Sequence, residues 1–185
     1  KLPQVRFPSN HKSHFARAMS FLLNWVSSFL SWFSRKKANL VILGLDNAGK
    51  STLLHLLQTG RVKVMEPTQH PNSSTVTVGS TTVKAIDMGG HAGGRLLWKS
   101  YFPNINGVVF VVDAADMLRL AEAKEELTKV LMTEAIADVP IVIIGNKIDS
   151  KHALGEKQFV EFMGLTDTCT GKNNTTKKGG RRPVE

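Results

Sequence analysis

Cysteine is almost absent from this chain of 185 residues. Its one cysteine, Cys169, cannot form an internal disulfide and has no evident base partner to activate it. A fold that depends on disulfides is therefore excluded, and a passive thiol in a reducing compartment such as the cytosol is expected. Hydrophobic residues make up 42% of the sequence, which suffices for the core of one globular domain.

Acidic residues are scarce at both ends of the chain, and this explains the net charge of +9. Residues 1–18 contain four lysines and arginines and no acid, and residues 172–185 contain five with a single glutamate. Only +1 is left for residues 19–171. The basicity thus belongs to solvated ends and not to a folded face, which argues against a nucleic-acid partner.

Regular patterning is also missing at the ends. Residues 1–18 contain two prolines and no periodicity, so we expect a disordered or non-native leader, with Met19 as the true start. From Thr166 the chain is rich in Thr, Lys, Gly and Asn and has no further apolar segment. The domain predicted over residues 38–185 is therefore expected to lack its last strand and helix.

No apolar run reaches the roughly 20 residues that cross a bilayer as a helix. Residues 19–33 come nearest, with 15 positions, and lead into basic residues at 35–37. On a helix their polar side chains share one side, and the other side carries Phe21, Leu22, Trp25, Val26, Phe29, Trp32 and Phe33. Residues 19–37 are thus predicted to be an amphipathic helix and basic linker on a membrane surface, without myristate because no Met-Gly start is visible. The alternative is an ordinary helix packed on the domain.

Between these ends, strand and helix patterns alternate. Continuously apolar runs predict strands buried on both faces at residues 39–44, 107–113 and 140–145. A hairpin is predicted from residues 73–78 and 81–87, joined across Gly79-Ser80. Apolar residues at helical spacing predict helices at 50–59, 117–133 and 155–163. This order is typical of an α/β fold with a doubly wound, mostly parallel sheet and helices on both faces.

Residues 44–51 match the phosphate-loop motif G-x-x-x-x-G-K-[ST] and lie between a predicted strand and a predicted helix. Backbone N–H groups in such a loop form a nest for anions, and the helix adds the positive end of its dipole. Lys50 would neutralise β- and γ-phosphate oxygens, and the Ser51 hydroxyl would bind Mg²⁺. The nucleotide contacts predicted here are Asp46, Asn47, Ala48, Gly49, Lys50, Ser51 and Thr52.

A second motif joins Asp87, at the end of the hairpin, to Gly90. The carboxylate can hold Mg²⁺ through a water, and the Gly90 N–H can approach a γ-phosphate because no side chain intervenes. Asp-x-x-Gly also occurs in ordinary turns. Its spacing behind the phosphate loop favours the binding site.

A third motif, Asn146, Lys147 and Asp149, directly follows an apolar strand. A carboxylate at Asp149 can accept hydrogen bonds from both the N1–H and the 2-amino group of guanine, a donor pair that adenine lacks. The motif therefore predicts GTP and GDP as ligands in preference to ATP.

The chain resembles the Sar-type small GTPases, relatives of the Arf family, over roughly residues 19–185. The resemblance rests on five stretches in the same order and at similar spacing: LVILGLDNAGKSTLLHLL, EPTQHP, DMGGH, LWKSYFPNINGVVFVVDAAD and VPIVIIGNKID. It implies a phosphate-loop GTPase domain that hydrolyses GTP with Mg²⁺.

The resemblance also assigns roles to single residues. Thr68 would be the switch threonine that reaches Mg²⁺ when GTP is bound, Asp46 would lie near the metal, and His91 would orient the attacking water. Where relatives carry a glutamate and bulkier polar residues, this chain has Ala92, Gly93 and Gly94. This departure is expected to loosen the segment through added backbone entropy.

The function implied by the resemblance is a switch that recruits the COPII coat to the endoplasmic reticulum membrane for budding towards the Golgi. Implied partners are COPII coat proteins, a membrane-bound exchange factor and a GTPase-activating coat subunit. The implied location is the cytoplasmic face of the endoplasmic reticulum, cycling with the cytosol, with the Golgi as a further location. Two alternatives stay open: a hydrolysis-deficient decoy or fragment of such a GTPase, and a phosphate-loop nucleotide kinase.

Overall fold

A computed structural model describes residues 37–78, 81–166 and 184 of the chain. The elements run in the order β1 (Lys37–Leu43), α2 (Lys50–Thr59), β2 (Asn72–Val78), β3 (Thr81–Asp87), α3 (Ala92–Arg95), α4 (Trp98–Tyr101), η1 (Phe102–Asn104), β4 (Gly107–Asp113), α5 (Leu120–Leu131), η2 (Glu134–Ile136), β5 (Ile141–Asn146) and α6 (Glu156–Met163).

The strands form one sheet in the order β2-β3-β1-β4-β5. β3, β1, β4 and β5 are parallel, and β2 runs antiparallel to β3. The register places Ile42 beside Asp87 and Asp113 beside Asn146, so the carboxyl ends of four strands meet at one edge. Ligands of parallel α/β sheets bind outside this edge. β5 is the last strand of this order, and its first residue, Ile141, makes a parallel bridge with Val184.

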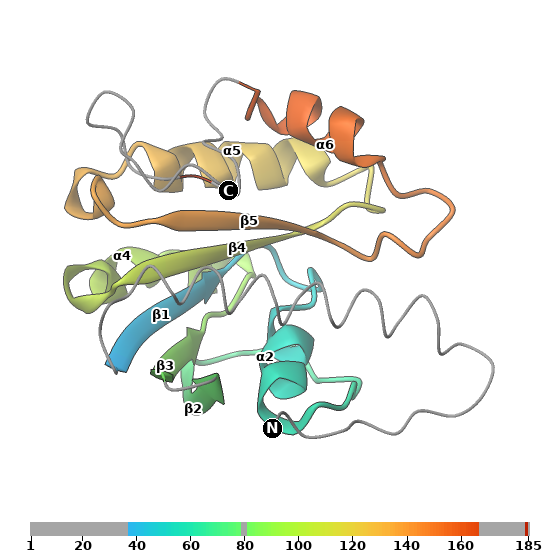
Figure 1. Cartoon of the computed structure of the whole chain (residues 1–185). Coiled ribbons are helices and arrows are strands. Elements are labelled where there is room, and N and C mark those ends of the chain that lie inside the picture. Colours follow the sequence, from blue (N-terminus) through green and yellow to red (C-terminus); the bar gives the residue numbers. More distant parts are fainter. Residues whose placement is uncertain (1–36, 79–80, 167–183, 185) are drawn as a thin grey trace.

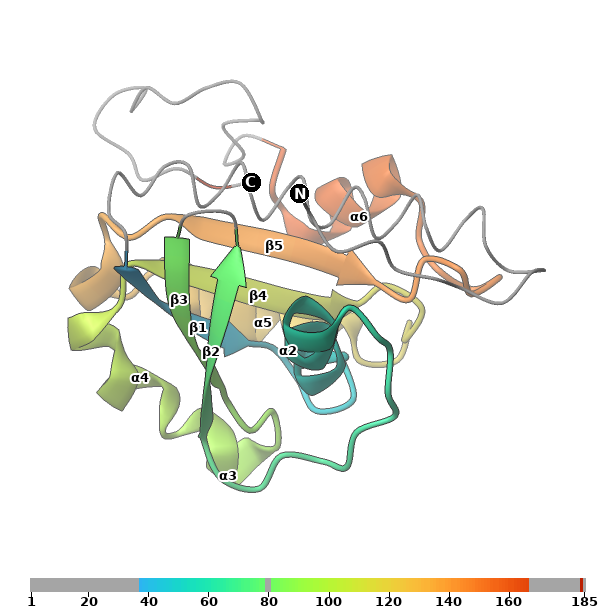
Figure 2. The same ribbon diagram turned by 60° about the horizontal axis from the view of Figure 1, so that its bottom comes forward.

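Alternate residues of the strands face two hydrophobic clusters. Val41 and Leu43 belong to the cluster shared with α5 and α6, and Leu40 and Ile42 belong to the cluster shared with α2. Figure 1 shows the corresponding layers, with α5 and α6 on one side of the sheet and α2 on the other. The segment after α2, residues 60–71, runs around the outside of the molecule to β2 (Figure 2).

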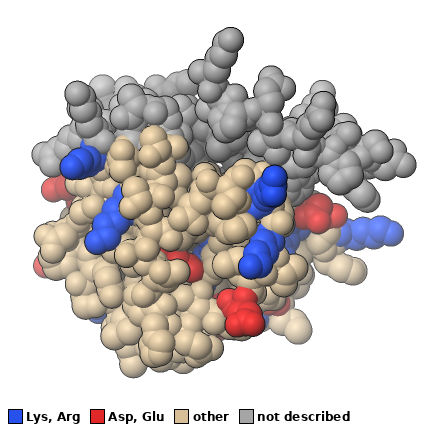
Figure 3. Space-filling model, turned by 90° about the horizontal axis from the view of Figure 1, so that it is seen from below, with Lys and Arg blue, Asp and Glu red and all other residues tan. Residues whose placement is uncertain are grey.

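Charged side chains are sparse on the face that Figure 3 shows. Among the described residues in that view, lysines and arginines stand in small separate groups and form no continuous basic band. The described helices include none that is long and apolar enough to cross a membrane.

The predicted fold class is confirmed. The helix at 50–59 coincides with α2, and the other strands and helices predicted between residues 39 and 163 are matched within three residues at their ends. The helix predicted from residue 19 lies outside the described residues. The helix predicted over 117–133 begins only at Leu120, because residues 113–119 form turns in which the Asp116 and Arg119 N–H groups bond to the carbonyls three residues earlier. The sequence did not indicate α3 and α4.

Candidate functional site

The phosphate loop leaves β1 through an unusual backbone path. Gly44 has φ +133°, and a Cβ there would lie 2.0 Å from the carbonyl oxygen of Val111. Asn47 and Gly49 also have positive φ, at 61° and 97°. Gly49 makes no side-chain cap bond at the start of the ten-residue helix α2, so within the described part of the chain the first N–H groups of the helix are left for an anion.

Lys50, the first residue of α2, is 95% buried, since its exposed fraction is 5%. Its Nζ donates a 2.8 Å hydrogen bond to the Leu45 carbonyl. Burial lowers the pKa of the Lys50 ammonium to about 8, although the negative charges of Asp87 and Asp46 act in the opposite direction. The loop therefore encloses a poorly solvated positive charge, which a phosphate group would stabilise.

Three predicted metal ligands meet beside this lysine. Ser51 Oγ donates to Asp87 Oδ2 at 2.6 Å, Thr68 Oγ1 donates to the same oxygen at 3.0 Å, and the two hydroxyl oxygens lie 2.8 Å apart. Each hydroxyl has one hydrogen, and the bonds to Asp87 use both, so each oxygen keeps lone pairs that can bind a cation. Asp87 is 3% exposed, and its Oδ1 is buried with no hydrogen-bond partner among the residues that the structure describes. Convergent hard oxygens with one carboxylate are a donor set that fits Mg²⁺.

Asp46 does not lie with these three residues. Its carboxylate pairs with the Arg119 guanidinium through bonds of 2.8 and 3.2 Å, in a two-pronged arrangement. The hydrogen bonds from Arg119 lower the pKa of Asp46 below its ordinary value. The geometry thus gives Asp46 a cationic side-chain partner, and its role as a metal ligand stays a prediction that this arrangement does not favour.

Gly90 and His91 follow Asp87 along the chain. A Cβ on Gly90 would lie 2.1 Å from the Asp46 nitrogen, so only glycine allows this segment to approach the phosphate loop so closely. His91 caps α3, because its Nδ1 accepts a 3.0 Å hydrogen bond from the Gly94 N–H. In the neutral imidazole the proton is therefore on Nε2. That nitrogen is buried and has no partner among the described residues.

The three residues of the third motif have different surroundings. Asn146 Nδ2 donates a 2.8 Å bond to the Ala48 carbonyl and so ties β5 to the phosphate loop. Lys147 has φ 60° and forms a 2.7 Å ion pair with Asp113. Asp149 is exposed, and no side chain of the described part of the chain binds its carboxylate. The Asp149 carboxylate is thus available to accept hydrogen bonds from a nucleotide base, while Asn146 and Lys147 hold the surrounding loops in place.

Several residues that shape the site were not predicted. Asp113 ends a buried strand as Asp87 does, and this shared position could have identified it. Arg119 is 73 residues from Asp46, and no local pattern connects them. Trp98 is buried and donates from Nε1 to the Gly89 carbonyl at 3.1 Å. Because this partner is a backbone atom nine residues earlier in the chain, no sequence motif indicated the contact.

The seven residues predicted to face a membrane lie outside the described residues, as does Cys169: Phe21, Leu22, Trp25, Val26, Phe29, Trp32 and Phe33. Their roles stay predictions.

Comparison with known proteins places this site in a family. A model described as the ADP-ribosylation factor (Arf) family matches residues 24–178. The chain is 39% identical to the small COPII coat GTPase SAR1 of Giardia intestinalis, over 88% of this chain and 86% of that protein. It is 38% identical to the small COPII coat GTPase SAR1B of Dictyostelium discoideum, over 84% and 81%. It is also 38% identical to ADP-ribosylation factor-like protein 8b of Arabidopsis thaliana, over 78% and 77%.

A solved structure extends the comparison to three dimensions. The Arl6 BBS3 small GTPase from Trypanosoma brucei, determined with the bound nucleotide analogue GppNp, is similar to this chain with a TM-score of 0.67. The sequences are 31% identical, and the match covers 80% of this chain and 84% of that one.

Proposed function

The chain belongs to the ADP-ribosylation factor family of small GTPases, and on this premise we propose that it is a GTP-driven switch that recruits COPII coat proteins to the endoplasmic reticulum membrane. As a member of this family it binds GTP and GDP and hydrolyses GTP. The membrane, the coat and the bound Mg²⁺ are the proposed part.

The observation that carries the proposal is the meeting of Ser51, Thr68 and Asp87. These residues come from α2, from the long segment 60–71 and from the end of β3. Thr68 lies outside any helix or strand, and its side-chain contacts with Asp87 and Ser51 tie this segment to the site. When bound, Mg²⁺ would neutralise phosphate charge here. A ligand that carries a γ-phosphate would therefore stabilise one position of the segment, and its loss would release the segment.

The same geometry suggests how the chain's own residues assist hydrolysis. A Cβ built on Gly89 would lie 3.0 Å from the Thr68 carbonyl oxygen and 3.3 Å from His91 Nε2. Both groups thus lie on the same side of Gly89, and a water admitted between them by a shift of this segment could donate to the Thr68 carbonyl while it accepts from the Nε2–H. The water oxygen would bond to the γ-phosphorus as the bond from that phosphorus to the β–γ bridging oxygen breaks, which leaves GDP, phosphate and the released proton. His91 would position the water and accept no proton through Nε2.

We propose that Asp149 selects guanine over adenine. Its exposed carboxylate can pair with the N1–H and 2-amino donors of guanine, while the Lys147–Asp113 pair and the Asn146–Ala48 bond fix the loop around it. Adenine lacks this pair of donors, so it would leave that carboxylate without a partner on the base.

The COPII assignment is supported by two SAR1 relatives whose matches cover 88% and 84% of the chain, whereas other SAR1 and Arf-like relatives match 60% to 78% of it. The partners proposed with it are a membrane-bound exchange factor and a GTPase-activating coat subunit. The proposed location is the cytoplasmic face of the endoplasmic reticulum, with cycling through the cytosol, and the Golgi as a further location. Membrane contact is assigned to the predicted helix at residues 19–37.

Coat recruitment on liposomes tests this proposal. The full chain, loaded with GDP or with GppNp, is mixed with anionic liposomes and purified COPII coat proteins, and the coat is measured after flotation. We expect recruitment with GppNp alone, and none with Ser51→Asn, which loses the hydroxyl that meets Asp87. Equal recruitment with GDP, or none with bound GppNp, would remove the coat assignment and leave the GTPase activity in place.

A further inference from the structure

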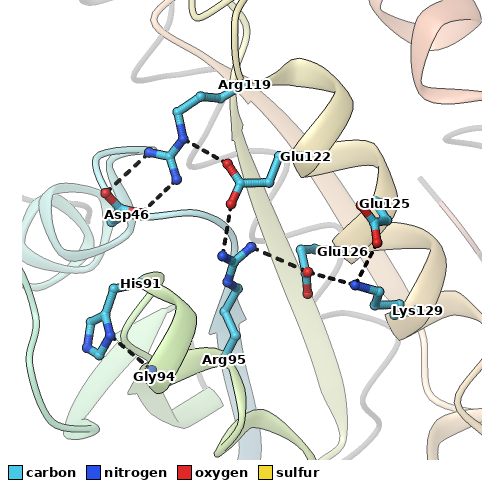
Figure 4. A network of polar contacts seen from close by, with 9 residues as sticks. All are labelled: Asp46, His91, Gly94, Arg95, Arg119, Glu122, Glu125, Glu126 and Lys129. Atoms are coloured by element: carbon cyan, nitrogen blue, oxygen red, sulfur yellow. Dashed lines mark hydrogen bonds and ion pairs between the residues drawn. The ribbon is translucent and has the colours of Figure 1, made fainter.

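A chain of ion pairs runs from the phosphate loop across α5 to the helix that His91 caps (Figure 4). Its first link is the two-pronged pair of Asp46 with Arg119. Planar pairing through two bonds fixes both the distance and the angle of the guanidinium. Arg119 immediately precedes α5, so the phosphate loop is held against the start of that helix.

Glu122, in the first turn of α5, contacts two arginines at once. Its Oε2 accepts from Arg119 Nε at 2.9 Å, and its Oε1 lies 2.8 Å from the Arg95 guanidinium. Hydrogen bonds from Arg119, together with those from Arg95, lower the pKa of the Glu122 carboxyl. Arg95 also reaches Glu126, at 3.4 Å. Figure 4 shows both oxygens of Glu122 turned towards different arginines.

The helix that Arg95 ends is short and weak by itself. α3 has four residues, two of which are glycines, and glycine inside a helix costs about 1 kcal/mol relative to alanine. Its position must therefore come from outside contacts. The Arg95–Glu122 pair is one of these, because the Arg95 side chain is only 15% exposed.

The two ends of the chain of ion pairs also meet through the backbone. Gly90 packs against the Asp46 nitrogen, and His91 follows it at the start of α3. Asp46, Arg119, Glu122, Arg95 and Gly90 thus form a closed ring of contacts that joins the phosphate loop, the start of α5 and the segment that carries His91. A negative charge on Asp46 in an anion-binding loop would repel phosphate if Arg119 did not neutralise it.

We propose that Glu122 is a positioning residue that couples binding of the γ-phosphate to the placement of His91, by holding Arg119 and Arg95 at the same time. This inference rests on the proposed function, since it concerns the response of the site to GTP. Exposed single ion pairs contribute little to stability. The effect of Glu122 comes instead from one carboxylate that joins two segments, which a substitution separates.

The substitution Glu122→Gln tests the coupling with little change of shape. Glutamine has one carbonyl oxygen, so it can accept from one arginine and turns an amide donor towards the other. Glu125→Gln is the matched control, because Glu125 lies on the same helix and pairs with Lys129. Arg119→Lys is a second test, since lysine keeps the charge but cannot bond Asp46 and Glu122 in the same geometry.

The measurement is the affinity of each full-length variant for GDP and for GppNp with Mg²⁺, together with single-turnover GTP hydrolysis and thermal unfolding. We expect Glu122→Gln and Arg119→Lys to lower the ratio of GppNp to GDP affinity by roughly fivefold or more, the lower end of typical coupling between sites. Hydrolysis of bound GTP should also slow. Glu125→Gln should leave the ratio and the rate unchanged.

The outcomes separate this inference from the function on which it rests. A folded Glu122→Gln variant with an unchanged affinity ratio and hydrolysis rate would overturn the coupling while the GTPase stands. An equal loss of affinity for both nucleotides would also overturn it, since that loss marks a purely structural role. If the unsubstituted chain bound neither nucleotide, the proposed function and the inference would fail together.

Discussion

The phosphate side and the base side of the site are built differently. On the phosphate side, Lys50 and Asp87 are almost fully buried, and the backbone takes conformations that favour glycine at Gly44 and Gly49. On the base side, Lys147 is held by an ion pair while Asp149 is exposed. Phosphates are common to all nucleotides, and only the base distinguishes them. Affinity and selectivity are therefore expected to depend on separate residues.

The largest difference is expected when one glycine is substituted on the phosphate side and one on the base side. Gly44→Ala places a Cβ on the Val111 carbonyl at a positive φ, so the free energy of unfolding should fall by roughly 3 to 4 kcal/mol. Gly145→Ala, in β5, meets the Phe159 ring at an ordinary 3.5 Å and should cost less than about 1 kcal/mol. Urea unfolding of the nucleotide-free proteins measures both. If the two substitutions lowered the free energy of unfolding by similar amounts, the claim that the backbone at Gly44 requires glycine would be wrong.

Removal of the base acceptor should affect binding and leave folding intact. Asp149→Ala is expected to weaken GDP binding by about 3 kcal/mol, roughly 100-fold or more, because two hydrogen bonds to a charged group are lost. ATP binding should stay unchanged. The control Glu161→Ala removes the same charge from the exposed surface of α6. Competition with labelled GDP measures the effect, and an equal loss for ATP would show that Asp149 is not selective.

His91 can be altered without removal of its cap. His91→Asn keeps a side-chain acceptor for the Gly94 N–H but loses the buried Nε2. Single-turnover GTP hydrolysis should slow roughly tenfold, or about 1.4 kcal/mol, with nucleotide affinity unchanged. His152→Asn, at an exposed histidine, is the control. An unchanged rate in His91→Asn would exclude the positioning role.

The pH dependence of binding should report Lys50. Its pKa in the folded, nucleotide-free protein is lowered from 10.5 to about 8 by burial, so it loses its proton as the pH rises through 8. Phosphate binding then requires proton uptake, and affinity should fall up to tenfold per pH unit above 8. The unfolded chain keeps this proton up to a higher pH. The nucleotide-free protein should therefore gain stability from Lys50 between pH 8 and 10.5.

Calorimetry in buffers of different ionisation enthalpy measures the proton uptake, and urea unfolding at the same pH values measures stability. Affinity that stays constant from pH 7 to 9.5 would show that Lys50 keeps its charge in the empty site.

The sequence indicated the elements whose signals are local. Both ends of α2 are marked, by Gly49-Lys50 at the start and Gly60 at the end, and the prediction matched. Helix α3 was missed because Gly93 and Gly94 have low helix propensity. Its contacts come from elsewhere in the chain: Gly94 packs on the Gly89 backbone, and Arg95 reaches α5. Tertiary packing, and not local propensity, therefore makes this segment helical.

The same distinction applies to the site. Ser51 and Asp87 were identified from motifs, and Thr68 was assigned by resemblance; the three side chains meet. The motif did not predict that Asp46 would pair with Arg119, because that contact joins distant parts of the chain. Residues that position functional side chains depend on packing, so spacing along the sequence does not identify them.

The buried indole of Trp98 has a practical consequence. It bonds to the Gly89 carbonyl and meets the ring of Phe110 edge-on, with 6.1 Å between centroids. Gly89 adjoins the glycine that approaches the phosphate loop, so a displacement there changes the surroundings of the indole. The chain has three tryptophans, and replacement of Trp25 and Trp32 by phenylalanine would leave Trp98 as the sole tryptophan, which can be excited selectively. Its fluorescence would then follow nucleotide exchange in real time, in protein that carries no added dye.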